Sequence, residues 1–459
     1  ANIFEAHSKL YNLLDQLIEK HKTTIIFTNT RSATERVVHH LKEDFPKKYT
    51  ENIGAHHSSL SKEKRFQIEQ NLRDGKLKVV VSSTSLELGI DVGYIDLVIL
   101  LGSPKSVSRA LQRIGRAGHK LHETAKGRFV ILDRDDLVEC SVMAKAIKER
   151  KIDNIYIPKN CLDVLSQHIY SMAIQKVWNI DEMLSLIRKS YCYKHLEKSD
   201  FLSVISYLAG DYSLEERNVY AKIWYDSGTK QIGKRGKLAR VISITNMGTI
   251  PDESFATVVI GSGEGKDSVI GKIDEAFLER LKKGDVFVLG GERYQFLFTR
   301  GMKAYVRGSV NLPPTIPAWF SEMLPLSFDL ALEIQKFRGK IKKMLQSGEN
   351  KDKIKEEIMS YLYSTENVAE QIFNYFNEQH HFSEIPDDKT ILIEHYKGEK
   401  HYTIFHTLYG RRVNDCLSRA VAFAVARTQH RDVEIGISDN GFYVASDKSV
   451  NVIQAFNLI

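Results

Sequence analysis

The residues best suited to chemistry in this sequence lie at 112–119, where two arginines sit at a predicted helix end that two glycines interrupt. A guanidinium group carries its charge at every physiological pH and forks toward phosphate oxygens. Arg113 and Arg116, held at a fixed angle by such a turn, could offset the charge that develops on a γ-phosphoryl group during its transfer. The alternative is a basic helix end that binds only solvent or a surface carboxylate.

A second polar segment, residues 82–91, directly follows an apolar run that ends at Val81. It begins with four hydroxyl side chains and continues to Gly89 and Asp91. At the carboxyl edge of a parallel sheet, such a segment offers backbone N–H groups and hydroxyls to a ligand. The alternative is that the hydroxyls only cap the N-terminus of a helix. Capping and ligand contact are compatible with one another.

Two further segments stand near the N-terminus. Thr28, Asn29 and Arg31 follow the apolar run 24–27, at a predicted strand-to-helix turn whose N–H groups could hold a phosphate. Residues 56–61 begin with a pair of histidines, which suggests a metal site at first sight. No cysteine or carboxylate stands at ligand spacing from that pair, so a metal site is not expected there.

These segments need a scaffold that brings the ends of several strands together. Residues 24–27, 78–81, 97–100 and 129–132 are short and nearly continuous apolar runs, and helical patterns separate them. Strands of this kind indicate a parallel sheet that helices cover on both faces. We therefore predict an α/β fold with a RecA-like domain over residues 1–150.

The rest of the chain is predicted to form two more domains. Residues 159–208 have a helical pattern, and a basic glycine-rich stretch follows at 233–237. This combination suits a winged-helix domain over residues 151–235, with the basic stretch as its wing. Beyond it, a β-rich stretch precedes a helical one at 327–380, and strands and a helix complete the sequence. The prediction for residues 236–459 is an α+β domain made of a β-sheet or barrel and helices.

The composition is that of an ordinary globular protein with a modest basic excess. The 459 residues include 65 Lys and Arg against 58 Asp and Glu, a net charge of +7. This excess fits a nucleic-acid partner and fits many cytosolic proteins equally well. The four cysteines are scattered, so they indicate reduced thiols rather than a zinc site or a disulfide framework. No segment reads as a membrane span or a signal peptide, which favours a soluble cytoplasmic protein.

The polar segments resemble conserved motifs of superfamily 2 helicases: residues 112–119 resemble motif VI, residues 82–91 motif V and residues 27–32 motif IV. Further stretches resemble the large helicase-related (Lhr) family in particular. They are residues 86–91, 102–106, 236–240, 246–252, 273–275, 284–291, 317–320, 324–327 and 410–414. Because these stretches follow one another along nearly the whole chain, the resemblance is more specific than any single motif.

The resemblance implies roles for residues of motifs V and VI. Arg116 would be the arginine finger, with Gln112 and Arg113 close to the nucleotide. Gly89 and Asp91 would face the nucleotide, and Asp91 would accept hydrogen bonds from the ribose hydroxyls.

The resemblance also implies a nucleic-acid track. Ser83 and Thr84 of motif V would contact the backbone of the nucleic acid. Thr28, Asn29 and Arg31 of motif IV would hold a phosphate of the same strand.

No phosphate loop is expected in this chain. Residues 261–267 imitate one, but Ile260 stands where its first glycine belongs, and Asp267 stands where a serine or threonine must follow the lysine. Residues 274–277 imitate the acidic Walker B box, although the preceding residues do not read as a buried strand. ATP and Mg²⁺ would then be held mainly by a first RecA-like domain outside this sequence. The chain alone is predicted to be inactive as an ATPase.

Two residues outside the motor motifs are candidates for contact with bases. Trp319 follows three prolines, so a stiff loop could present its ring to an unpaired base, and an ordinary core tryptophan is the alternative. Ile250 stands in a Gly-Thr-Ile-Pro turn and could wedge between base pairs. A buried turn residue is equally compatible with that sequence.

The resemblance as a whole implies an ATP-dependent helicase that moves 3′-to-5′ on single-stranded DNA and unwinds DNA or RNA–DNA duplexes. One rival interpretation is a non-catalytic module that binds or anneals nucleic acid. Another is a RecA-like domain that serves as a protein-interaction scaffold, which would show no salt-dependent binding of DNA.

Overall fold

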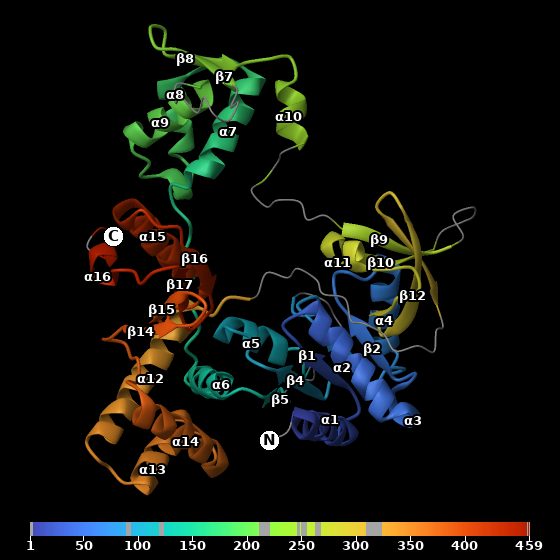
Figure 1. Ribbon diagram of the computed structural model, residues 1–459. Helices are drawn as coiled ribbons and strands as arrows, with labels where there is room; N and C mark the ends of the chain where they lie inside the picture. The colour runs from blue at the N-terminus through green and yellow to red at the C-terminus, as the bar shows by residue number, and fades with distance from the viewer. Residues whose placement is uncertain are drawn as a thin grey trace. The chain divides into compact units, whose positions relative to one another are not determined.

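The computed structural model describes residues 3–88, 93–118, 124–210, 221–245, 248, 255–261, 268–308, 324–456 and 458 (Figure 1). The chain divides into two compact units, one formed by residues 1–153 and 254–459 and the other by residues 154–253. Among the described residues, the first unit contains three sheets of five, five and four strands, and the second contains one sheet of three strands. No described helix is long and apolar enough to span a bilayer.

The first sheet is parallel, with the strand order β2-β3-β1-β4-β5. Its strands are β1 (Thr24–Phe27), β2 (Ile53–His56), β3 (Val79–Ser82), β4 (Leu97–Leu101) and β5 (Gly127–Val130). Every residue of β1, β2 and β3 is buried, as expected for strands covered on both faces. The predicted α/β class with a parallel sheet is therefore confirmed.

Helices cover the two faces of this sheet. They are α1 (Ile3–Glu19), α2 (Arg31–Asp44), α3 (Pro46–Tyr49), α4 (Lys62–Arg73), α5 (Val107–Ile114) and α6 (Arg134–Lys148). Successive residues of a strand point to opposite faces, so Ile26 packs with α1 and α2, while Ile25 and Phe27 pack with α5 and α6. Each strand thereby stabilises both layers.

Polar caps fix where the helices after the strands begin. Thr30 caps α2 by accepting a hydrogen bond from Ala33 N at 3.1 Å. Ser106 caps α5 in the same way, from Arg109 N at 3.2 Å, and Asp133 caps α6. Because a cap satisfies N–H groups that the first turn leaves open, these residues hold the preceding loops at the carboxyl edge of the sheet.

The second sheet has the order β10-β9-β13-β12-β11 and packs against the RecA-like part. It consists of β9 (Phe255–Ile260), β10 (Ser268–Asp274), β11 (Val286–Leu289), β12 (Glu292–Arg300) and β13 (Lys303–Gly308), with α11 (Glu275–Arg280) after β10. Leu60 belongs to its core. The backbone pairs as well, because Ser61 N donates to Ile270 O (3.0 Å) and Lys272 N donates to Ser59 O (2.7 Å).

Strand β10 corrects one expectation. The residues before 274–277 were predicted not to form a buried strand, and this was wrong, because β10 leads into them with Ile270 and Ile273 buried. However, β10 lies at the edge of its sheet and pairs antiparallel with β9. Its carboxyl end therefore does not join the strand ends of the parallel sheet.

The end of the chain forms a helical group and a third sheet. The helices α12 (Phe328–Gln346), α13 (Lys351–Leu362) and α14 (Glu366–Phe382) share a core with α6. The sheet contains β14 (Leu392–Lys397), β15 (His401–His406), β16 (Glu434–Ile437) and β17 (Phe442–Ser446), with α15 (Arg411–Gln429) and α16 (Val452–Phe456) packed on one face. All pairs in this sheet are antiparallel.

The unit of residues 154–253 is a winged helix. Its helices are α7 (Leu162–Gln175), α8 (Ile180–Ile187), α9 (Lys198–Ala209) and α10 (Ala239–Thr245), with a 3-10 turn η1 (Tyr191–Tyr193). The strands β6 (Trp178–Asn179), β7 (Ile223–Asp226) and β8 (Gln231–Lys234) form an antiparallel sheet. The β7–β8 hairpin is the wing, and Gly233 and Lys234 of the predicted basic stretch belong to its second strand.

Candidate functional site

The motif segments meet at the carboxyl edge of the parallel sheet. Motif IV follows β1, motif V follows β3, and α5 with motif VI follows β4. These strands are neighbours in the order β3-β1-β4 and run parallel. The fold therefore brings together three segments that lie up to 88 positions apart in the sequence, from residue 28 to residue 116.

Arg113 is the residue that ties these segments together. Its side chain is 1% exposed, and its Nε donates to Glu87 Oε2 at 3.0 Å. One terminal nitrogen donates to Asn29 Oδ1 at 3.1 Å, and the guanidinium lies 5.3 Å from the centre of the Phe27 ring. Burial lowers the pKa of Arg113, and the Glu87 carboxylate opposes that effect. Arg113 thus links motifs IV, V and VI inside the domain.

Asn29 extends this link to the loop before α5. Its Nδ2 donates to the backbone oxygen of Ser103 at 2.6 Å, while its Oδ1 accepts from Arg113. Both ends of the amide are therefore engaged within the protein. A side chain held in this way fixes the distance between the end of β1 and the loop that follows β4.

Glu87 is a residue of this site to which the sequence analysis gave no role. It is 8% exposed and lies near two arginines of α5, with Oε2 3.0 Å from Arg113 Nε and Oε1 3.4 Å from Arg109 Nε. A buried carboxylate is costly unless it is paired. The available signal was an acid between Leu86 and Leu88, in a segment followed by an arginine-bearing helix.

Gln112 and Arg116 lie at the same helix end as Arg113. Gln112 is exposed on α5, and Arg116 is partly buried in the turn that follows it. Gly115 permits this turn, because a Cβ there would lie 2.9 Å from the backbone oxygen of Leu111. Gly118 has φ +72°, a conformation that L side chains rarely adopt. The glycines therefore set the direction of Arg116 relative to the sheet.

The hydroxyl residues after β3 bond to the neighbouring strand β2. Ser83 is buried and its N–H donates to His56 O at 3.3 Å. Ser85 Oγ donates to the same oxygen at 2.9 Å, and Thr84 is exposed. No helix begins within residues 83–88, where Glu87 N instead closes a turn on Thr84 O. Within these residues the Ser85 hydroxyl bonds to β2 and caps no helix.

His56, the last residue of β2, completes this junction. It is 1% exposed, with Nδ1 2.7 Å from Ser85 Oγ and Nε2 3.0 Å from Glu69 Oε1. Burial lowers the pKa of His56 to about 4, against the opposing effect of the Glu69 carboxylate. The lowered pKa leaves His56 neutral at pH 7, with Nε2–H donating to Glu69 and Nδ1 accepting from the Ser85 hydroxyl, which it shares with His56 O.

We expect His56→Gln to reduce the sensitivity of the protein to acid. Unfolded histidine binds a proton below pH 6.5, whereas folded His56 does so only near pH 4, so the folded state loses stability as the pH falls through this window. For His56 the loss between about pH 7.5 and pH 5 amounts to roughly 2 kcal/mol. Guanidinium unfolding of both proteins at both pH values measures the difference.

The control for this experiment is His381→Gln, which changes an exposed histidine on α14. It should lose as much stability between the two pH values as the unchanged protein does. If His56→Gln also shows the full loss, the acid sensitivity has another origin.

The motif IV side chains are also engaged within the protein. Thr28 is 1% exposed and its Oγ lies 2.8 Å from Thr34 Oγ. Arg31 donates to Ser59 Oγ at 3.1 Å, and its guanidinium lies 5.6 Å from the Phe255 ring at the start of β9. Arg31 therefore stands where the RecA-like part meets the second sheet.

Glu35 and His57 form a clamp at the same junction. Both side chains are fully buried, and His57 Nε2 lies 2.7 Å from Glu35 Oε1. The Glu35 carboxylate also accepts hydrogen bonds from Gly290 N and from Gly291 N, the second at 2.7 Å. The paired histidines thus have structural partners. Across the described part of the chain, no group of three or more His, Cys, Asp or Glu residues is placed to hold a metal ion.

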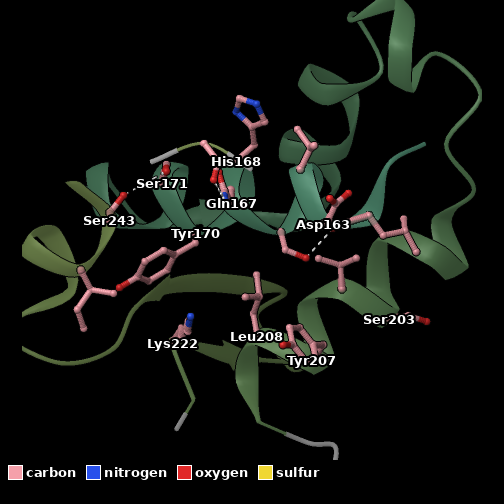
Figure 2. A pocket seen from close by; sticks show the side chains of 16 residues that line it. Asp163, Gln167, His168, Tyr170, Ser171, Ser203, Tyr207, Leu208, Lys222 and Ser243 are labelled. Atoms are coloured by element: carbon pink, nitrogen blue, oxygen red, sulfur yellow. Dashed lines mark hydrogen bonds between the residues drawn. The ribbon is translucent and has the colours of Figure 1, made fainter. Parts of the chain in front are cut away.

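The winged-helix unit contains a cavity of about 990 Å³ between α7, α9 and α10. Three of its polar residues connect helices: Tyr170 OH donates to Ala239 O at 3.0 Å, and Ser171 Oγ lies 3.4 Å from Ser243 Oγ. Figure 2 shows His168 at one side of the cavity and Ser203 at the other, pointing away from each other. Ser203 and His168 therefore do not form a serine–histidine pair.

Four predicted site residues lie outside the described residues. They are Gly89, Asp91, Ile250 and Trp319. Most of the imitation phosphate loop, residues 262–267, also lies outside them. The roles expected for these residues stay predictions.

Three family models match parts of the chain. Residues 6–120 match the helicase conserved C-terminal domain, residues 145–315 match the winged helix domain of large helicase-related protein, and residues 385–458 match the DEAD/H associated family. The matches follow the order of the elements described above. They cover β1 to β4 of the parallel sheet, the winged helix, the second sheet and the third sheet.

Relatives match over almost the full chain. The chain is 58% identical over 456 residues to the ATP-dependent helicase Lhr-Core of Methanothermobacter thermautotrophicus, covering 98% of the chain and 52% of that protein. It is 51% identical over 460 residues to the ATP-dependent helicase Lhr-Core of Methanocaldococcus jannaschii, covering 99% and 52%. The chain thus spans about half the length of these curated relatives.

A solved structure has the same arrangement of elements. It is the Mycobacterium smegmatis helicase Lhr bound to single-stranded DNA and AMP-PNP. The TM-score is 0.66 at 25% sequence identity, over 97% of this chain and 53% of that protein.

Proposed function

This chain belongs to the Lhr-Core helicase family, and on that premise we propose that it is the part of an ATP-dependent helicase that senses the nucleotide and tracks one strand of nucleic acid. The observation that carries this proposal is the buried link made by Arg113. Its bonds to Glu87 and Asn29 hold motifs IV, V and VI in one arrangement. A motor needs such a link, because its nucleotide-sensing and strand-holding segments must move together.

In this proposal Arg116 contacts the γ-phosphoryl group that ATP supplies. The residues at this helix end fit an anion, since Arg116 and the exposed Gln112 are set beside the sheet edge by Gly115 and Gly118. Arg113 does not contact ATP in this proposal, because its guanidinium is bonded to Glu87 and Asn29. It is therefore a positioning residue that fixes the direction of Arg116.

We further propose that nucleic acid passes the motif IV and motif V loops. The exposed hydroxyl of Thr84 is free to face a phosphate. Thr28 and Asn29 have side chains bonded within the protein, and Ser83 is buried. The N–H groups of Thr28 and Ser83 also donate to Ser82 O and His56 O, so in this proposal these residues hold the strand ends that present Thr84. Arg31, Ile250 and Trp319 complete the proposed track.

ATP and Mg²⁺ are proposed to be held mainly by a RecA-like domain beyond this sequence. The related mycobacterial structure contains AMP-PNP and single-stranded DNA, and it is about twice as long as this chain by coverage. The 3′-to-5′ direction, the unwinding of DNA or RNA–DNA duplexes and a cytoplasmic location belong to the same proposal. The division into domains at residues 1–150, 151–235 and 236–459 also stays a proposal, and the compact unit of residues 154–253 extends past residue 235 to include α10.

The test compares the full-length protein with this chain. We expect the full-length protein to hydrolyse ATP faster with single-stranded DNA, and to unwind a duplex with a 3′ tail but not one with a 5′ tail. The chain alone should bind single-stranded DNA, more weakly as salt rises from roughly 50 to 200 mM, without hydrolysing ATP. Filter binding and a coupled ATPase assay measure these properties.

The same experiment separates the rival interpretations. Binding of DNA by the full-length protein without stimulated ATP hydrolysis would favour an annealing module and contradict the proposal. Absence of salt-dependent binding would favour a protein-interaction scaffold.

A further inference from the structure

The loop between β4 and α5 connects the motor motifs to the third sheet. It begins at Ser103, whose backbone oxygen accepts from Asn29 Nδ2 at 2.6 Å. Ser103 Oγ donates to Glu139 of α6 and accepts from Lys105 N at 3.0 Å. The loop ends at Ser106, the cap of α5. Its conformation therefore determines where the arginine-bearing helix starts.

Lys105 is the centre of this loop. It has φ +67°, a conformation that non-glycine residues rarely adopt, so surrounding contacts must hold it. Its Nζ lies 3.0 Å from Glu139 Oε2 and 3.2 Å from Asp136 Oδ1 on α6, and 3.7 Å from Asp439 Oδ2. Although burial acts against its charge, Glu139, Asp136 and Asp439 raise the pKa of Lys105 above its usual value. Lys105 is thus a fully charged residue in a mostly buried cluster of carboxylates.

Asp439 brings the third sheet into this cluster. It lies in the turn between β16 and β17, and its side chain is 13% exposed. The other carboxylate oxygen, Oδ1, accepts from Leu326 N at 3.0 Å and from Arg411 N at 3.1 Å. Arg411 is the first residue of α15. One carboxylate therefore joins the start of α15, the segment before α12 and the motor loop.

The loop is tied to the C-terminal part by its backbone as well. Ser327 N donates to the backbone oxygen of Lys105 at 2.8 Å. The N–H of Gly410, just before α15, donates to Asp439 O at 3.0 Å. The contact is therefore continuous from the third sheet through Lys105 and Asn29 to Arg113.

We propose that Asp439 and Lys105 are positioning residues for the motor: the third sheet, through this pair, holds the loop that sets the start of α5 and thereby the direction of Arg116. The inference rests on the proposed function of Arg116. It assigns the C-terminal sheet a part in ATP hydrolysis although none of its residues lies in motifs IV, V or VI. Losing the pair would loosen α5 without removing any group that contacts ATP.

The test uses Asp439→Asn in the full-length protein. Asparagine keeps an oxygen for Leu326 N and Arg411 N and removes the charge that faces Lys105, so the fold should be retained. We expect the kcat of DNA-stimulated ATP hydrolysis to fall roughly three- to tenfold, with little change in the KM for ATP. Hydrogen exchange of the backbone amides of residues 106–116 should become faster at the same time.

A second variant and a control complete the design. Lys105→Gln should lower kcat at least as much, and adding Asp439→Asn to it should cause little further loss, because both changes break one link. Arg134→Gln is the matched control: it breaks an exposed ion pair with Glu378 that joins α6 to α14. It should leave both kcat and the hydrogen exchange of residues 106–116 unchanged.

Hydrogen exchange at residues 106–116 that is the same in Asp439→Asn as in the unchanged protein would overturn the inference, whatever the ATPase result. An unchanged kcat in Asp439→Asn would overturn it as well. Failure of the proposed function is distinct, because the unchanged protein would then show no DNA-stimulated hydrolysis, while the exchange data would still decide whether the third sheet holds α5.

Discussion

Replacement of Arg116 by alanine in the full-length protein is expected to lower the kcat of DNA-stimulated ATP hydrolysis by roughly a thousandfold or more, the effect of losing an arginine finger. The reason is that a guanidinium stabilises charge on the γ-phosphoryl group in the transition state more than in the bound substrate. Binding of ATP should therefore change far less than kcat. Steady-state kinetics with saturating single-stranded DNA measure both quantities.

Two further variants sharpen this experiment. Arg116→Lys keeps the charge without the planar fork, so it should recover only part of the lost rate. Arg128→Ala removes an exposed arginine on β5 of the same domain and should leave kcat unaltered. An Arg116→Ala protein with nearly the original kcat would exclude Arg116 as the finger.

The largest expected effect on stability belongs to Arg113. Arg113→Met should lower the free energy of unfolding of the RecA-like part by about 3 kcal/mol, because it removes the buried partner of a buried carboxylate and leaves only the longer contact with Arg109. Glu87 is the residue left behind, with a side chain only 10% exposed. Asn29 would lose its donor as well. Chemical unfolding followed by circular dichroism measures this loss.

A double-mutant cycle tests the cause. Glu87→Leu together with Arg113→Met replaces the buried pair by apolar side chains, so the double variant should be more stable than Arg113→Met alone. Arg109→Met is the matched control. Arg109 faces the same carboxylate at 3.4 Å with 22% exposure, and its loss should cost about 1 kcal/mol or less. Equal losses for Arg109→Met and Arg113→Met would contradict the assignment of Arg113 as the central link.

The sequence predicted the parallel sheet where its strands are continuous apolar runs. Strands β1, β3 and β4 are of this kind. Strand β2 was not recognised, because Gly54 and His56 interrupt its apolar character. Gly54 is required by close packing, since a Cβ there would lie 3.2 Å from Ile68 and from Leu77. His56 is accommodated by Ser85 and Glu69, which come from other elements.

The positions of the motifs could be predicted, but the partners of their side chains could not. The resemblance to motif VI implied that Arg113 lies near the nucleotide, whereas the structure shows its guanidinium bonded to Glu87 and Asn29. Arg113 is 26 positions from Glu87 and 84 positions from Asn29 in the sequence. No local pattern in a single sequence reports pairing at these separations. The same limit applies to Lys105 and Asp439. They meet only because the third sheet packs against the loop between β4 and α5.

The Glu35 clamp has a mechanical consequence. Helix α2 holds the β11–β12 turn by two backbone hydrogen bonds to Glu35, and Lys42 adds a bond to Gly291 O at 3.1 Å. A side chain at Gly291 would come within 2.8 Å of Val38, so the turn lies directly against the helix. We therefore expect the second sheet to move together with the RecA-like part. A small rotation of α2 would then displace the far end of β12 by a larger distance, because no flexible connection lies between them.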